Sequence, residues 1–280
     1  MYVNRILYED NDVIVCHKPA GIATQTARVG QADMVSEIFN YLSSKRDGGA
    51  VKTPCVGVIH RLDQPVEGIL VFAKNKAAAA DLSRQAAGEG MKKEYLALIC
   101  GKNREKQGEL TDYLLKDGKT NISRVVPPEV KGAKQARLSY EILQDALPEK
   151  LFPEKGNEPG LSGKDGTDDG LGGSGLRCAL VRVCLYTGRH HQIRVQMAHA
   201  GMPLLGDRKY ADEAALELSA KLGIRETALC AYRLAFTHPK TGKRMQFEIR
   251  PEGAAFCRLN PEMPCRTGNG LYGKCKEFEV

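Results

Sequence analysis

Short runs of alternating apolar residues recur along this chain and constrain its fold more than any other feature. KKEYLALIC at 92–100 and CALVRVCLYT at 178–187 alternate with the period of a strand that has one buried face. Other strand candidates are ILYED and DVIVCHKP around a turn at 10–12, ILVFAK, ARLSYEIL, CAYRLAFTHP and RMQFEIRP. Because several of these runs are hairpin neighbours, we expect a mixed and mainly antiparallel sheet.

Three segments with helical signals lie between these runs. Asp33 is a candidate N-cap for an apolar pattern at 35–42, and Asn75 is a candidate for KAAAADLSRQAA. RHHQIRVQMAHAG at 189–201 is expected to form a helix that Gly201 closes. The expected fold class is therefore α+β, with helices flanking the sheet.

The composition places the chain among ordinary globular proteins. Hydrophobic residues make up 42% and charged residues 27% of the chain. Charges interrupt every apolar run of the N-terminus, and no stretch has the roughly 18 apolar residues that a membrane span needs. We therefore expect a cytoplasmic protein. A net charge of +7 is compatible with a polyanionic partner but does not by itself indicate one.

The nine cysteines are scattered, and none forms a C-x-x-C pair. The closest approximation to a zinc site is Cys257, Cys265 and Cys275, with no histidine nearby. We expect no metal site, and we interpret most of the cysteines as small buried residues in a reducing compartment.

Residues 154–177 change character, since they are rich in Gly, Asp, Ser and Pro. They are expected to form a flexible insertion rather than a domain boundary, because the runs on either side resemble partners in one sheet. Residues 1–250 are then one domain, and 251–280 form a tail of unknown role.

The segment HRLD at 60–63 places charges between the apolar pairs VI at 58–59 and IL at 69–70. A carboxylate in such a setting needs a partner to stay ionised, so Asp63 requires an explanation. Arg194 is a candidate partner, because on a helix it shares a face with His190 and His191. A solvated basic face is the alternative, and spacing alone does not decide between them.

HRLD resembles the motif of the RluA-type pseudouridine synthases, and four more segments agree with that family in the same order. KPAG at 18–21 is similar to its early turn, and KKEYLA at 92–97 to its tyrosine-bearing strand. GRHHQIRVQMAHAGMPLLGDRKY at 188–210 and LCAYRLAFTHP at 229–239 resemble its later motifs. The resemblance implies a pseudouridine synthase fold with a central RNA-binding cleft, and a catalytic domain at 1–250.

The resemblance also implies roles for single residues. Asp63 would be the catalytic aspartate, and Arg194 would hold it as an ion pair. Tyr95 would stack on the target uracil and is a candidate to assist the final proton removal. Arg61 would occupy the space left when a nucleotide is flipped out. Further RNA contacts are expected from His60, Arg189, His191, Gln192, Lys18 and Lys93.

The implied reaction converts uridine to pseudouridine in ribosomal or transfer RNA. It breaks the C1′–N1 bond and joins C1′ to C5 of the same base, with the carboxylate either adding to C1′ or removing a C2′ proton. No metal or organic cofactor is expected. The expected partner is RNA, neither DNA nor a membrane, and the chain is expected to be a monomer. No room precedes residue 1 for the small N-terminal RNA-binding domain of many relatives, so we expect a bare catalytic domain.

The chain departs from the family's pattern at three places. Val66-Glu67-Gly68 stands where Thr-Ser-Gly is usual, His190 replaces a usual threonine, and Gln196 replaces a common histidine. Glu67 is expected to add a negative charge near Asp63. These departures keep open a non-catalytic RNA-binding protein on the same fold, and a lone aspartate also permits a base-removing glycosylase.

Overall fold

The computed structural model describes residues 5–28, 30–45, 53–101, 105–146, 177–258 and 276–278. Twelve strands in these residues form one sheet, whose main path runs β1-β2-β4-β10-β5-β9-β8-β6-β7. β3 pairs with β4, and β11 pairs with β10 and β12. Among the described strands only β4 and β10 pair in parallel, so the predicted mixed and mainly antiparallel sheet is confirmed. The strands are β1 (Ile6–Glu9), β2 (Val13–Lys18), β3 (Gly57–Val58), β4 (Glu67–Ala73), β5 (Lys92–Gly101), β6 (Gln107–Asp117), β7 (Ile122–Val125), β8 (Lys134–Ala146), β9 (Arg177–Leu185), β10 (Leu229–Thr237), β11 (Arg244–Glu248) and β12 (Lys276–Phe278).

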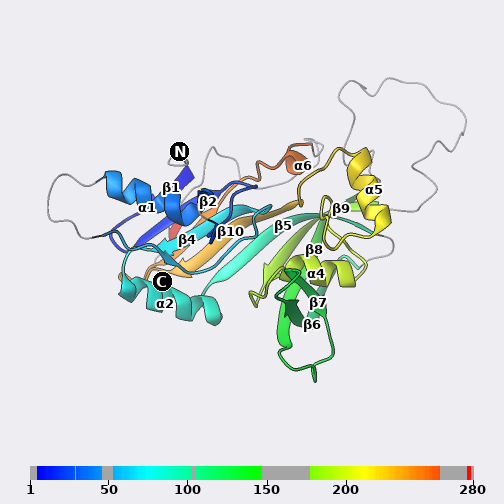
Figure 1. Ribbon diagram of the computed structural model, residues 1–280, viewed down its shortest axis with the longest axis horizontal. Helices are drawn as coiled ribbons and strands as arrows, with labels where there is room; N and C mark the ends of the chain where they lie inside the picture. The colour runs from blue at the N-terminus through cyan, green and yellow to red at the C-terminus, as the bar shows by residue number, and fades with distance from the viewer. Residues whose placement is uncertain are drawn as a thin grey trace, which may run out of the picture.

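Helices cover both faces of the sheet. Figure 1 shows α1 and α2 beside the β1-β2-β4 end and α4 and α5 beside the β8-β9 end. None of the helices in the described part of the chain is long and apolar enough to cross a membrane. The helices are α1 (Met34–Ser44), α2 (Lys76–Ala87), α4 (Gln192–His199), α5 (Glu213–Lys221) and α6 (Ala254–Cys257).

The predicted helix starts are confirmed at two caps. The Asp33 side chain accepts a hydrogen bond from the N–H of Ser36, and the Asn75 side chain accepts one from Ala78. Such bonds satisfy N–H groups that have no partner within the helix. Helix α5 was not predicted from the sequence, although Asp212 caps it in the same way.

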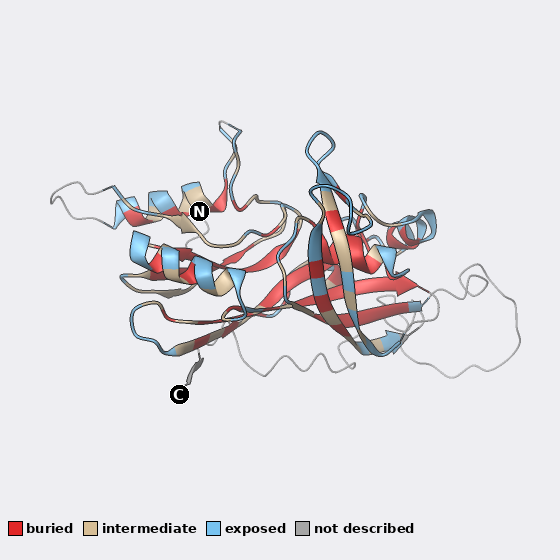
Figure 2. Ribbon diagram, turned by 90° about the horizontal axis from the view of Figure 1, so that it is seen from below, coloured by how far each residue is buried: buried red, intermediate tan, exposed pale blue. Residues whose placement is uncertain are grey.

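The alternation of the strands separates two hydrophobic cores. Tyr95 and Ala97 of β5 pack with α1 and α4 on one face of the sheet. Leu96 and Leu98 of the same strand pack with α2 and α5 on the other face. Figure 2 shows the buried residues concentrated along the central strands. We call the face that carries Tyr95 the α1/α4 face.

Gly68 allows β4 and β10 to approach closely. Its φ is +142°, and a Cβ at this position would lie 2.5 Å from the Cβ of Ala231. A larger residue would therefore force the two strands apart.

The structure differs from the sequence expectations in several places. β6 and β7 form a hairpin that projects from the sheet (Figure 1) and was not predicted. The predicted helix over 189–201 is shorter, since α4 begins at Gln192. β12 shows that the end of the tail adds a strand beside β11. Apart from Arg177, which starts β9, the insertion expected at 154–177 lies outside the described residues, as do Cys265 and Cys275.

Candidate active site

Asp63 lies in the loop between β3 and β4, and the segment after β2 holds this loop in place. The Thr24 hydroxyl accepts a hydrogen bond from the N–H of Leu62 at 3.0 Å and donates one to the Leu62 carbonyl at 2.9 Å. The N–H of Gly21 donates to the Gln64 carbonyl at 2.8 Å, and the Gln64 amide donates back to the Gly21 carbonyl at 3.0 Å. The KPAG and HRLD motifs therefore form one unit that fixes the backbone on both sides of Asp63.

Lys18 joins the same unit from within. Its side chain is fully buried, and Nζ donates to the carbonyls of Pro19, Ile22 and Gln64 at 3.0, 2.6 and 3.2 Å. Burial lowers the pKa of Lys18 to about 8, although Asp63 acts in the opposite direction. The expected contact with an RNA phosphate would require the amine to leave all three carbonyls, so this geometry favours a structural role.

The guanidinium of Arg194 bridges two carboxylates. Nη1 donates to Oδ2 of Asp63 at 2.9 Å, while Nε and Nη2 donate to the two oxygens of Asp207 at 2.7 Å each. The Arg194 and Asp207 side chains are 4% and 1% exposed, but that of Asp63 is 26% exposed. The expected ion pair is present, and its carboxylate is the reachable member.

Asp207 is the partner that sequence reasoning missed. It accepts the N–H of Lys209 at 2.9 Å within its own turn. Its bidentate bond to Arg194 fixes the plane of the guanidinium and so aims the third nitrogen at Asp63. The spacing of Arg194 and Asp207 in the sequence does not indicate that their side chains meet.

A chain of hydrogen bonds approaches Asp63 from a second side. The N–H of Ser123 on β7 donates to the Tyr210 hydroxyl at 2.9 Å, and that oxygen lies 2.6 Å from Nδ1 of His191. Tyr210 is thus free to donate its own proton to Nδ1, which leaves the proton of His191 on Nε2. Nε2 lies 3.6 Å from Oδ2 of Asp63. His190 stacks on His191 with 3.7 Å between ring centroids.

The sequence pattern predicts that the two histidines share a helix face with Arg194, and this prediction is wrong. His191 precedes α4 in the left-handed conformation, with φ 53°, and the turn brings it to Asp63. Burial, and to a lesser extent Arg194, lowers the pKa of His191 to about 4, although Asp63 opposes this shift. His191 is therefore neutral near pH 7.

Tyr95 lies on the α1/α4 face and is 6% exposed. Burial first, and the nearby Asp63 second, raise the pKa of its phenol. No hydrogen bond of the Tyr95 hydroxyl is found within the described part of the chain. Tyr95 therefore offers a neutral ring beside the carboxylate, and the raised pKa opposes ionisation of its hydroxyl.

Two of the expected RNA contacts are exposed cations. Arg61 is exposed and makes no hydrogen bond or ion pair with another described residue. Arg189 is exposed as well, and its Nε donates to the carbonyl of Gln135 at 2.8 Å. Both guanidinium groups are available to an anionic ligand.

The other expected contacts are less accessible. Gln192 is 3% exposed. Its Oε1 accepts from the Thr187 hydroxyl and the N–H of Arg189, and its Nε2 donates to the Arg137 carbonyl on β8 and to Oε1 of Gln196 on α4. His60 accepts a 3.4 Å hydrogen bond from the N–H of Val71. Lys93 is 8% exposed and has no hydrogen-bond or ion-pair partner among the described residues. Gln192 therefore holds the local structure together and is not exposed for contact with RNA.

The sequence suggests that Glu67 adds its charge near Asp63, but in the structure its side chain points elsewhere. Its carboxylate accepts the N–H groups of Gly253 at 2.8 Å and of Glu252 at 3.1 Å. On β4 it shares a face with Ile69 and Val71, which pack in the core opposite the α1/α4 face. This departure from the family's pattern therefore anchors the segment that follows β11.

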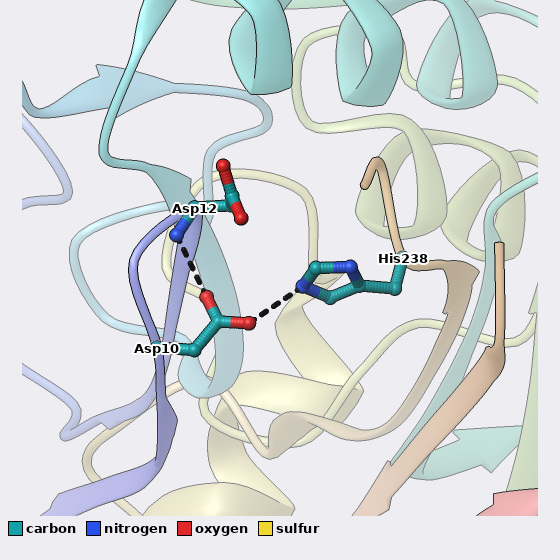
Figure 3. Close-up of side chains that lie close together, drawn as sticks. All are labelled: Asp10, Asp12 and His238. Atoms are coloured by element: carbon teal, nitrogen blue, oxygen red, sulfur yellow. Dashed lines mark hydrogen bonds and ion pairs between the residues drawn. The ribbon is translucent and has the colours of Figure 1, made fainter. Parts of the chain in front are cut away.

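Asp10, Asp12 and His238 are the one group with metal-ligand spacing in the described residues (Figure 3). His238 Nδ1 accepts the N–H groups of Lys240 and Thr241, so its proton is on Nε2, which donates to Asp10 at 2.7 Å. The second oxygen of Asp10 accepts the N–H of Asp12 at 2.8 Å. A metal would have to displace this proton and these bonds, so the group is a structural tie between two turns.

The arrangement at Asp63 restricts the chemistry. One reachable carboxylate is bonded to a buried cation, and a neutral ring lies beside it. Asp207 is enclosed and fully bonded, so it cannot serve as a second acid or base. The site suits a carboxylate that acts directly on its ligand, as a nucleophile or as a base.

Comparison with known proteins agrees with this geometry. Residues 12–199 match the profile of the family described as RNA pseudouridylate synthase. A tRNA pseudouridine synthase C of Haemophilus ducreyi is 35% identical over 84% of this chain and 86% of its own length. The RNA pseudouridine synthase YhcT of Bacillus subtilis and the ribosomal large subunit pseudouridine synthase D of Nitrosomonas europaea are each 31% identical, over 84% and 87% of this chain. The chain spans only 65% and 61% of these two relatives.

A solved structure gives a similar fold. The human RNA pseudouridylate synthase domain containing 4 covers 90% of this chain, with a TM-score of 0.63 and 20% sequence identity. At this level of identity the likeness concerns the path of the backbone. The expected α+β fold is confirmed.

Proposed function

Because this chain belongs to the RNA pseudouridylate synthase family, we propose that it isomerises uridine to pseudouridine in structured RNA. The observation that carries the proposal is the Asp63 carboxylate, which is 26% exposed and bonded to a buried arginine. Relatives named for ribosomal and transfer RNA make both classes candidate substrates. RNA is the partner we propose, and the cytoplasm is the compartment.

Asp63 acts at the sugar. It either adds to C1′ as the C1′–N1 bond breaks, or removes a proton from C2′ to release the base. The turned-over uracil then forms the C1′–C5 bond. In the first route this displaces the Asp63 carboxylate from C1′, and in the second Asp63 returns the proton to C2′. C5 then loses its hydrogen, and N1 gains a proton. Atoms balance without a second substrate, and the hydrogen bond from Arg194 holds the Asp63 carboxylate in place.

The other residues bind and orient the nucleotide. Tyr95 supplies a stacking surface for the uracil, a contact worth about 1–3 kcal/mol per base. Arg61 occupies the gap left in the RNA stack, and its exposed, unpaired side chain supports that role. Arg189 contacts the backbone, and His191 keeps Asp63 in position from its second side.

The test is tritium release from RNA that carries 5-³H-uridine, because forming the C1′–C5 bond expels this hydrogen. Ribosomal and transfer RNA pools are assayed separately, and the product is identified by nucleoside mass spectrometry. Release with pseudouridine formation supports the proposal and identifies the RNA class. RNA binding without release would favour the non-catalytic alternative, and free uracil with abasic RNA would indicate a glycosylase.

A further inference from the structure

Lys93 is a largely buried lysine whose ammonium has no partner within the described protein. It is 8% exposed and lies on the same face of β5 as Tyr95. Lys18 donates to three carbonyls and Arg194 to two carboxylates, whereas Lys93 has no acceptor in the part of the chain described. The Nζ atom is not enclosed, so it can be reached by a ligand.

The neighbouring His60 has the same deficit. Its Nε2 accepts the N–H of Val71, so its proton is on Nδ1, and Nδ1 is buried with no partner among the described residues. Burial, together with the charge of Lys93, lowers the pKa of His60 to about 3, so the ring is neutral and cannot accept from Lys93 through Nδ1. Two donors therefore lie in one region without an acceptor.

The surroundings of Lys93 indicate which acceptor is missing. A Cβ built on Gly188 would lie 3.9 Å from Nζ and would meet nothing closer, so the absence of a side chain at 188 leaves the approach to the ammonium open. Gly188 precedes Arg189, and His60 precedes Arg61, and both arginines are exposed. Lys93 thus lies between two segments that each present a guanidinium, which is the setting of an anion site.

A phosphodiester is the ligand group that fits this place, because it is the permanent anion that an RNA carries at each nucleotide and lysine is a common phosphate-binding residue. Burial lowers the pKa of Lys93, so a neighbouring anion would favour its charged form.

We propose that Lys93 is a phosphate-binding residue that pairs with one backbone phosphate of the RNA strand entering at Arg61 and Arg189. This inference rests on the proposed function, since it takes RNA as the ligand. It makes Lys93 a group whose charge destabilises the free protein and is compensated in the complex. Removing this charge should therefore raise the stability of the free protein and lower its affinity for RNA.

The experiment compares Lys93→Met with Lys92→Met, which removes the same charge from the exposed opposite side of β5. Both are made in the full chain with Asp63→Asn, so that binding is measured without turnover. Affinity for ribosomal and transfer RNA pools is measured between about 50 and 200 mM salt. Thermal unfolding of each variant is measured without RNA.

Lys93→Met is expected to weaken binding about tenfold at low salt and to reduce the slope of log affinity against log salt by about 0.7–0.9, as for one lost phosphate contact. It is also expected to raise the unfolding temperature, whereas Lys92→Met changes both quantities less. If Lys93 had only a structural role, its replacement by methionine would lower the unfolding temperature.

An unchanged salt slope in Lys93→Met would overturn this inference while leaving the synthase activity intact. Lys93→Met is also made in a chain that keeps Asp63. If this variant lost turnover while RNA affinity and salt slope stayed unchanged, Lys93 would contact the uracil and not a phosphate. Absence of tritium release from wild type with a normal slope difference would overturn only the proposed function. No RNA binding by the Asp63→Asn chain would overturn both.

Discussion

Asp63 and Arg194 are separated by 131 residues in the chain, yet Nη1 of Arg194 donates to Oδ2 of Asp63 at 2.9 Å. The arginine is 4% exposed and the carboxylate 26% exposed, so the cation belongs to the core while the anion faces the surface. Holding a carboxylate this way fixes its position without blocking its approach to a ligand.

Replacing Arg194 with methionine is expected to destabilise the protein as well as to abolish turnover. Asp207 is 1% exposed and would lose its bidentate partner, and removing one member of a buried pair costs about 3–5 kcal/mol. The free energy of unfolding is measured with urea. The control Arg208→Met removes an exposed arginine beside Asp207, and equal losses in the two variants would contradict the bridge.

Replacing Glu67 with alanine is expected to lower stability but not turnover. The variant leaves the N–H groups of Glu252 and Gly253 without their acceptor, a loss of about 1–3 kcal/mol. Glu67→Gln keeps an acceptor oxygen and is expected to lose less. A large fall in turnover in a folded Glu67→Ala chain would mean that this side chain acts on the site.

His191 makes the stability depend on pH in a defined window. Its pKa in the folded protein, about 4, lies below its usual 6.5, so the unfolded chain binds the proton more readily. The free energy of unfolding should therefore fall as the pH is lowered from about 6.5 to about 4, with no contribution from His191 above that window. Urea unfolding of wild type and His191→Gln over this range should show a smaller fall in the variant, and parallel curves would contradict the lowered pKa.

Tyr95 should contribute to RNA binding through its ring rather than its hydroxyl. Tyr95→Phe is expected to keep the affinity for RNA within about threefold, whereas Tyr95→Ala should lose about 1–3 kcal/mol of stacking. Affinities are measured in chains that also carry Asp63→Asn. If both variants bound as tightly as the parent, the stacking role would be wrong.

Much of the sheet was predictable because its central strands are rich in apolar residues. β5 and β9 lie where they were expected, although both faces of each strand are buried instead of one, and the Asp33 and Asn75 caps begin their helices as predicted. β6 and β7 were not predicted because they bury few apolar residues. The hairpin projects from the sheet (Figure 1), and β6 has a single buried residue, Leu114, so it has little apolar alternation to detect.

The candidate site was predicted in its members more than in its geometry. Asp63 and Arg194 followed from motifs, but Asp207 and the direction of Glu67 depend on which faces the tertiary structure brings together. His191 adopts a left-handed turn that a helical pattern does not indicate. The burial of Lys18 and Lys93 was equally invisible, since a lysine near a motif resembles a phosphate ligand until its surroundings are known.

The most direct test of the account is tritium release under single-turnover conditions by wild type and by Asp63→Asn, with RNA affinity measured for both chains. The account predicts release by wild type and at least a ~10³-fold loss in the variant, since removing a covalent or proton-transfer group has effects of this size. It also predicts affinities within about threefold of each other, because Asp63 is held by the protein rather than by the RNA. Sustained release by Asp63→Asn would contradict the central role of this carboxylate.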